Sequence, residues 1–204
     1  MRYVSIDLES SGLDPEKHQV LEFGAVIDDT ENQLPLEDLP KFNVYIKHET
    51  IVGEAYALSM NARILDKISG REPSSVQVIT PDLLKYRFCN FLYKNGLIER
   101  IQTICYKRIL DIYSEHYPNK INVAGKNFAN FDNLFLKKLS GFNEIQFHRR
   151  FLDVGPMFVQ KEDKEVPGLE ECLRRAGMEK TVAHTAIEDC LDVIKLIRFK
   201  IGQE

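Results

Sequence analysis

The chain has 204 residues, of which 44% are hydrophobic and 28% charged, and its formal net charge at pH 7 is -4. These proportions exclude a disordered tail and a membrane protein, and the length suits one core, so we expect a single domain over residues 1–204. The slightly acidic balance argues against a protein that coats DNA nonspecifically.

No membrane or export segment is evident. No apolar run approaches the roughly 20 residues that span a bilayer, and the N-terminus enters an extended segment directly. We therefore expect a cytoplasmic protein with no membrane partner. The four cysteines, Cys89, Cys105, Cys172 and Cys190, are widely spaced and form no pair at zinc-finger separation, which predicts reduced, mostly buried thiols.

Three extended segments come first, at residues 3–9, 19–28 and 42–48. The links between them are rich in Gly, Pro, Asp and Asn, which predicts an antiparallel meander.

The first of these segments carries two acids, Asp7 and Glu9, within an apolar stretch. Alternation along a strand places both on one face, opposite Val4, Ile6 and Leu8. Two ionised carboxylates at such a short distance repel each other, unless one of them is protonated or a cation lies between them. An exposed edge strand with a solvated acidic face is the alternative, and this segment alone does not decide between the two.

Helical patterns dominate the middle of the chain. One covers residues 54–68, a second covers about 81–95, and an irregular one covers 97–117. The boundaries of the second are marked by Thr80 as a cap, Pro81 in the first turn and Gly96 as the stop.

Strands and helices alternate in the second half. We expect a buried strand at 121–125, a helix at 131–141, a strand within 145–153, a helix from Pro167 to Gly177 and a final helix over about 184–201. The apolar stripe of the final helix is Ile187, Leu191, Ile194, Ile197 and Ile201. Strands first, followed by alternating helices and strands, predict an α/β fold with a mixed sheet and helices on both faces.

Asp132 and Asp153 are two further acids beside predicted strands. Asp132 begins a helix just after a buried strand, and the ends of central strands are where α/β sheets commonly bind ligands. Capping of its own helix is the alternative for Asp132. Asp153 is expected to be structural, and Arg149 and Arg150 to be a solvated pair of surface cations.

His184 and Asp189 flank the start of the final helix in the segment HTAIED. Five residues of helix correspond to about 140° of rotation, so both side chains would share a face poorly if both were helical. We therefore expect His184 on the preceding loop, where it could swing toward a substrate while Asp189 stays fixed. A surface histidine or a cap is the alternative.

In their order and context these residues resemble the DEDDh, or DnaQ-like, family of 3′→5′ exonucleases. The pattern is Asp-x-Glu on the first strand, Asp132 at a helix start and His-x-x-x-x-Asp on the last helix. The resemblance covers residues 1–34 and 121–201, and it continues in the segments ESSGLDP, LEFGAV, KNFANFD and GLEECLRRAGM. It implies a ribonuclease-H-like fold, with a mixed five-stranded sheet flanked by helices.

The resemblance also implies roles for five side chains: Asp7, Glu9, Asp132 and Asp189 as metal-binding carboxylates and His184 as the general base. A site made only of oxygen ligands suits Mg²⁺ or Mn²⁺. Two such ions activate a water and stabilise the leaving 3′ oxygen. An imidazole with a pKa of about 6.5 is suited to taking the proton from that water.

The family places the chain after its first motif against the terminal nucleotide. This makes Ser10, Ser11 and Leu13 candidates for contacting the terminal sugar and base, and Asn127 and Phe131 for shaping the pocket. Leu13 as a core residue and Asn127 as a tie within its own loop are the alternatives. Ser10 and Ser11 stand where Thr is frequent in the family, which keeps a hydroxyl group there.

The helical region at about 50–120 is expected to determine the substrate. The segments IDLESSGLDP and HRRFLDV resemble oligoribonucleases, so we expect release of nucleoside 5′-monophosphates from single-stranded nucleic acid with a free 3′ end, in particular short RNA. The alternatives are a DNA 3′→5′ exonuclease or proofreading-type subunit, and a noncatalytic relative that binds nucleic acid. The last would predict a lost acid or a replaced His184, and neither is found. A homodimer is left open.

Overall fold

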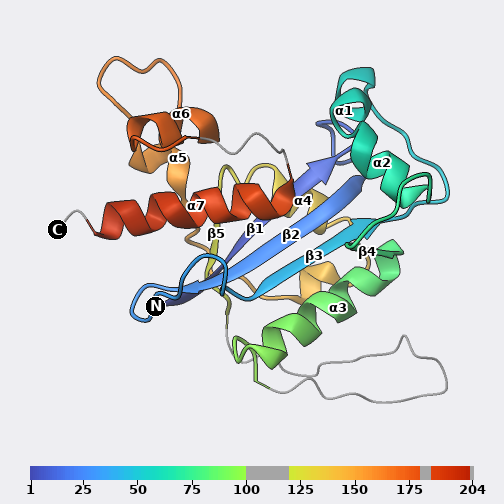
Figure 1. Cartoon of the computed structure of the whole chain (residues 1–204), viewed down its shortest axis with the longest axis horizontal. Helices are drawn as coiled ribbons and strands as arrows, with labels where there is room; N and C mark the ends of the chain where they lie inside the picture. Colours follow the sequence, from blue (N-terminus) through green and yellow to red (C-terminus); the bar gives the residue numbers. More distant parts are fainter. Residues whose placement is uncertain (100–119, 180–184, 203–204) are drawn as a thin grey trace.

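The computed structural model describes residues 1–99, 120–179 and 185–202 (Figure 1). They form one six-stranded sheet with the strand order β4-β3-β2-β1-β5-β6. The strands are β1 (Arg2–Ser10), β2 (Val20–Asp29), β3 (Lys41–Ile46), β4 (Gln77–Ile79), β5 (Val123–Gly125) and β6 (Leu152–Asp153). Among the described residues, no helix has the length and apolar character that would let it cross a membrane.

The first three strands form the predicted antiparallel meander. In its register, Asp7 on β1 lies opposite Gly24 on β2, and Glu9 lies opposite Glu22. Strand β5 adds in parallel to β1, and β6 adds in parallel to β5. The sheet is therefore mixed, as expected.

The sheet has six strands where five were predicted, because β4 pairs in parallel with β3 at one edge. This strand has three residues, of which only Ile79 is buried. So short and exposed a segment carries no alternation to identify it from sequence.

Eight helical elements are described: α1 (Ala55–Met60), α2 (Ala62–Ile68), α3 (Pro81–Lys94), α4 (Asp132–Leu136), a 3₁₀ turn (Phe142–Glu144), α5 (Val154–Met157), α6 (Leu169–Arg175) and α7 (Ala186–Ile201). The helix predicted at 54–68 is divided at Asn61, and the one predicted at 131–141 ends at Leu136. The helix predicted at 97–117 falls almost wholly outside the described residues, and residues 97–99 are not helical.

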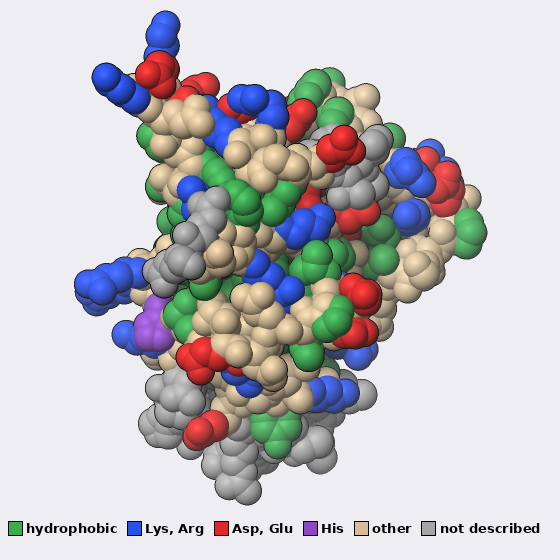
Figure 2. Space-filling model, turned by 60° about the vertical axis from the view of Figure 1, so that its left-hand side comes forward, with side chains coloured by type: hydrophobic (Ala, Val, Ile, Leu, Met, Phe, Trp, Pro, Cys, Tyr) green, Lys and Arg blue, Asp and Glu red, His purple; other side chains and the backbone are tan. Residues whose placement is uncertain are grey.

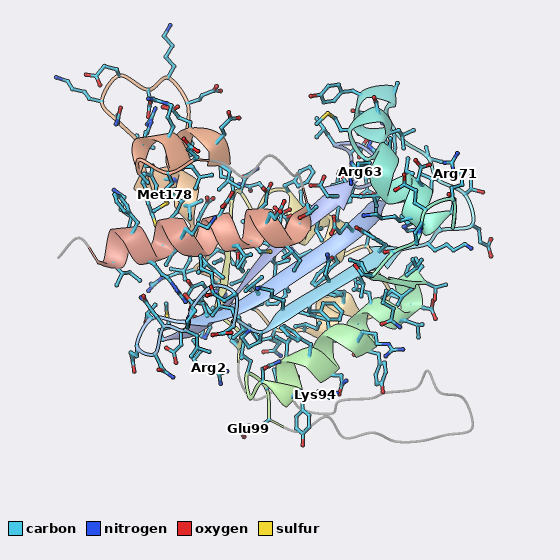
Figure 3. All side chains as sticks on the ribbon, viewed as in Figure 1. Arg2, Arg63, Arg71, Lys94, Glu99 and Met178 are labelled. Carbon is cyan, nitrogen blue, oxygen red and sulfur yellow. The ribbon has the colours of Figure 1, made fainter. Side chains whose placement is uncertain are left out.

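Helices cover both faces of the sheet (Figure 1). On one face, α3, α4 and the 3₁₀ turn enclose an apolar core in which the rings of Phe88 and Phe142 stack at 5.8 Å. On the other face, α5, α6 and α7 pack on a second core that includes Val26 and Ala124. Arg2 joins β1 to the C-terminal end of α3, where it donates to the carbonyl oxygens of Asn95 and Gly96 (Figure 3).

The apolar stripe predicted for the final helix is partly wrong. The side chains that α7 buries include Ala186, Cys190, Val193, Ile194, Leu196 and Ile197. Ile187 and Leu191 are only partly buried, and Ile201 is 45% exposed. Figure 1 shows the reason, since the last turn of α7 projects beyond the sheet. Cys89, Cys172 and Cys190 are buried thiols that take part in no disulfide among the described residues, as predicted, and Cys105 lies outside that part of the chain.

Candidate active site

Strand β1 carries Asp7 and Glu9 on the face that α7 covers. Val4, Ile6 and Leu8 point into the opposite core, so the alternation predicted from sequence is observed. Both acids are half-buried in the middle of the sheet, which excludes the edge-strand alternative.

The N-terminal end of α7 brings a third acid to these two. One side-chain oxygen from each of Asp7, Glu9 and Asp189 lies within 4.8 Å of the other two, a spacing that could hold a metal ion. Asp189 belongs to the first turn of α7, which begins after Thr185. The Thr185 side chain accepts a hydrogen bond from the Glu188 N–H at 3.3 Å and so caps the helix. Asp7 and Asp189, which lie near opposite ends of the sequence, therefore meet at one end of β1.

Asp132 is the fourth predicted acid, and it is 3% exposed at the start of α4. It is not one of the three acids whose oxygens lie within 4.8 Å of one another, but it interacts electrostatically with both Asp7 and Glu9. Phe131 occupies the N-cap position of α4 and makes no side-chain cap hydrogen bond. The Asp132 carboxylate accepts from its own backbone N–H, in the first turn of α4, and from that of Leu8. Asp132 therefore helps to satisfy the start of its helix, as the alternative held, and also interacts with the other acids.

Burial and neighbouring negative charges raise the pKa of two of the four acids, Asp7 and Asp132. Burial and the charges of Asp132, Asp189 and Glu9 hold the pKa of Asp7 well above its ordinary value. Burial raises the pKa of Asp132 to about 7, although hydrogen bonds with backbone groups act in the opposite direction. A divalent cation among these oxygens would reverse the repulsion and favour the ionised carboxylates.

His184 lies outside the described residues, so its assignment as the general base stays a prediction. The described chain resumes at the next residue, Thr185, which caps α7 at the acidic cluster.

The two serines after Glu9 are buried, and their hydroxyls bond within the protein. Ser10 Oγ donates to the carbonyl oxygen of Gly12 at 2.7 Å. Ser11 Oγ donates to the carbonyl oxygen of Val52 at 2.6 Å and accepts from the N–H of Gln19 at 2.9 Å. This geometry supports a role in joining the loop after β1 to the segment before α1. Contact of either serine with a nucleotide stays a prediction.

Leu13, by contrast, is 71% exposed at the tip of that loop, which excludes the core alternative. Asn127 is exposed and has a left-handed backbone with φ of 59°, and its carbonyl oxygen accepts from the N–H groups of Asn130 and Phe131. Phe131 is partly buried against Phe135, at a ring distance of 5.1 Å. Leu13 lies between β1 and β2, and Asn127 and Phe131 lie between β5 and α4. Contacts of these three residues with substrate stay predictions.

Asp153 is structural, as expected, because its side chain caps α5 by accepting from the Gly155 N–H at 3.1 Å. Arg149 and Arg150 are both exposed, as expected for surface cations.

The sequence reasoning missed Glu22 and Gly24, which lie on β2 directly beside the acids of β1. Glu22 is completely buried, and its carboxylate accepts from the N–H of Ala186. A Cβ on Gly24 would lie 2.6 Å from the backbone carbon of Ala186, so only glycine allows α7 to approach so closely. The signal was present in LEFGAV, where an acid and a glycine interrupt a buried strand.

Comparisons with known proteins agree with this fold. No family model matches the chain. An oligoribonuclease from Photobacterium profundum is 23% identical over 201 residues, which cover 95% of this chain and 90% of that protein.

Solved nuclease structures have the same fold as this chain, at lower sequence identity. The nuclease domain of 3′hExo, a DEDDh family member bound to rAMP, matches with a TM-score of 0.64 and 14% identity, over 98% of this chain and 92% of that one. Cell-death related nuclease 4 matches with a TM-score of 0.63 and 16% identity, and the match spans 98% of this chain and 64% of that one. E. coli exonuclease I with a dT13 oligonucleotide has a TM-score of 0.63 and 15% identity, over 97% of this chain and 40% of that one.

The chain therefore has the fold of the DEDDh exonucleases, and the predicted ribonuclease-H-like fold class is confirmed. The resemblance to this family, with its local similarity to oligoribonucleases, is confirmed as well.

Proposed function

We propose that this chain is a metal-dependent 3′→5′ exonuclease that releases nucleoside 5′-monophosphates from single-stranded nucleic acid. The observation that carries the proposal is the trio of Asp7, Glu9 and Asp189, whose oxygens lie within 4.8 Å of one another beside buried Asp132. A binding protein without catalysis gives no reason to gather four acids at this point. The similarity to an oligoribonuclease and to DEDDh nucleases supports the same activity.

The residues present fit a divalent cofactor. Every donor in the cluster is a carboxylate oxygen, which suits Mg²⁺ or Mn²⁺ and not zinc. Asp7, Glu9, Asp132 and Asp189 would hold two ions, which supply an activated water and stabilise the leaving 3′ oxygen. The raised pKa of Asp7 and of Asp132 is the feature that such charges would relieve.

The protein itself would supply positioning and a proton acceptor. Strand β1 fixes two acids in the sheet, and the capped first turn of α7 fixes a third. His184, one residue before the helix cap, would take the proton from the attacking water. Leu13, exposed at the loop tip, would contact the terminal base.

Short RNA is the substrate that we favour. The oligoribonuclease relative is similar over nearly its whole length. In the space-filling view, the Lys and Arg side chains on the visible face are scattered among acidic and hydrophobic ones and form no continuous stripe for a long strand (Figure 2). We propose that one domain performs the reaction and that the region at about 50–120, which contains α1, α2, β4 and α3, sets substrate length.

A DNA 3′→5′ exonuclease is the second candidate. It is supported by the similarity to E. coli exonuclease I, which is solved with a dT13 oligonucleotide. This chain spans only 40% of exonuclease I, so the substrate of that protein is weak support for the substrate of this one.

The test is digestion of 5′-labelled RNA and DNA, each at a few nucleotides and at a few tens, with Mg²⁺, Mn²⁺ or chelator. We expect metal-dependent shortening from the 3′ end, fastest on the shortest RNA. The Asp7→Ala variant should bind metal weakly and cleave nothing. Glu37→Ala, which removes an exposed acid from the segment between β2 and β3, is the control and should retain activity. Full activity of Asp7→Ala would reject the two-metal proposal.

A further inference from the structure

Helix α7 packs along its length on one face of β2. Every second residue of the strand points to this face, in the order Glu22, Gly24, Val26 and Asp28. Gly24 meets the backbone of Ala186, and Val26 belongs to the core beneath the helix. An acid therefore stands near each end of the row.

The two acids hold opposite ends of the helix. Asp28 accepts hydrogen bonds from Arg198, in the last turns of α7, at 2.6 and 3.0 Å. Glu22 Oε2 accepts from the N–H of Ala186, the first residue of α7, at 3.4 Å. Only the second end carries Asp189, so only Glu22 is placed where it can affect the acidic cluster.

A glutamate at position 22 is energetically unfavourable by itself, because its carboxylate is buried. Its side chain is completely buried, and burial of a carboxylate is unfavourable unless hydrogen bonds compensate. The Ala186 N–H provides one compensation, at a helix N-terminus that favours a negative charge, and the Asn43 side chain provides another. Glu22 does not belong to the trio of mutually close acids, so the proposed reaction does not use it as a ligand.

We propose that Glu22 is a positioning residue, whose carboxylate holds the first turn of α7 against the sheet so that Asp189 stays within reach of Asp7 and Glu9. The inference rests on the proposed function, because it takes the acidic trio to be a metal site. Glu22 would act through the reach of its hydrogen bond to Ala186 and not through its charge.

Two single substitutions separate the effect of the length of the Glu22 side chain from the effect of its charge. Glu22→Gln keeps the length of the side chain and an oxygen that can accept from Ala186, but it removes the charge. Glu22→Asp keeps the charge and shortens the side chain by one methylene group. Both are milder than truncation to alanine, so both are suited to giving folded protein.

The measurements are Mn²⁺ affinity, from the electron paramagnetic resonance signal of the free ion, and kcat and KM on a labelled oligonucleotide. We expect Glu22→Asp to weaken Mn²⁺ binding by about 10- to 100-fold, the usual effect of losing a group that orients a metal-binding side chain. Its kcat should fall with KM little changed, while Glu22→Gln should behave like the parent.

Asp28→Asn is the matched control, since it changes a buried acid on the same strand that holds the other end of the same helix. It should lower the melting temperature and leave Mn²⁺ affinity unchanged.

The opposite ranking, with Glu22→Asp like the parent and Glu22→Gln impaired, would overturn the inference in favour of a charge effect. Equal behaviour of the two variants, whether both retain or both lose affinity, would overturn it as well. A parent chain that binds no Mn²⁺ would instead reject the proposed function itself, and the inference with it.

Discussion

Asp28 on β2 and Arg198 on α7 form a two-point ion pair, at 2.6 and 3.0 Å, with the aspartate side chain completely buried. The hydroxyl of Tyr3 on β1 donates to the same carboxylate at 2.7 Å. Two adjacent strands and the final helix are therefore joined at one buried charge.

Removal of the cation should destabilise the fold strongly. Arg198→Met leaves Asp28 buried with its charge uncompensated, which typically lowers the free energy of unfolding by about 3 kcal/mol or more. Urea unfolding followed by circular dichroism measures the loss. The control is Arg174→Met, which removes a 72% exposed guanidinium paired with Glu171 and should change stability by less than about 1 kcal/mol. Equal losses in both variants would contradict the role of the buried pair.

A side chain at Gly24 should disturb both the fold and the site. Gly24→Ala places a Cβ 2.6 Å from the backbone carbon of Ala186 and 2.8 Å from its oxygen, so α7 must move away. Overpacking of this kind typically costs about 1 to 3 kcal/mol, and here we expect weaker Mn²⁺ binding too. Calorimetry and metal titration measure the two effects. Gly168→Ser, at a helix N-cap with nothing within 4 Å, should leave both properties unchanged.

The pKa of Asp132 predicts how stability depends on pH when metal is removed with a chelator. Burial raises this pKa to about 7, above its value in the unfolded chain, so the folded state holds the proton more tightly. Its contribution to stability is fully present below about pH 4 and is lost as pH rises toward about 7. Melting temperatures at pH 5, 6, 7 and 8 in chelator should therefore fall with pH.

Two comparisons test the assignment of this slope to the acidic site. Asp132→Asn has no proton to lose and should flatten the slope, leaving the part that Asp7 contributes. Saturating Mg²⁺ requires the ionised carboxylates, so its stabilising effect should grow with pH. A slope that Asp132→Asn leaves unaltered would place the titrating group elsewhere.

His184→Ala tests the predicted general base. It should slow turnover by about 10² to 10⁴ and leave metal affinity nearly unchanged. The parent's rate should fall as pH drops below the pKa of the imidazole, and the variant should lose that limb of the profile. His148→Ala, at an exposed histidine of another segment, should be as active as the parent. A shared pH profile would assign the base to another group.

Part of this arrangement could be predicted from the sequence. Alternation along the first strand placed Asp7 and Glu9 on one face, because the side-chain period of a strand depends only on local geometry. The meander, the position of Asp132 at a helix start and the final helix followed from equally local patterns.

The rest depends on packing, which local patterns do not encode. The apolar stripe of α7 was partly wrong at Ile201, because the sequence does not reveal where the sheet beneath the helix ends. Strand β4 has too few residues to show a period. Glu22 was missed because a buried acid gains a role only when its neighbour across the fold, the Ala186 N–H, is known.

The acids of the site come from residues 7, 9, 132 and 189, and the last of them lies in the final described helix. During synthesis on the ribosome, β1 emerges first with two of the carboxylates, but the acidic trio cannot close until α7 has been translated and docked on β2. A chain released before α7 would lack Asp189 and the helix that packs on β1 and β2. Closure of the acidic site would therefore follow the docking of α7, when the strands beneath it have already been made.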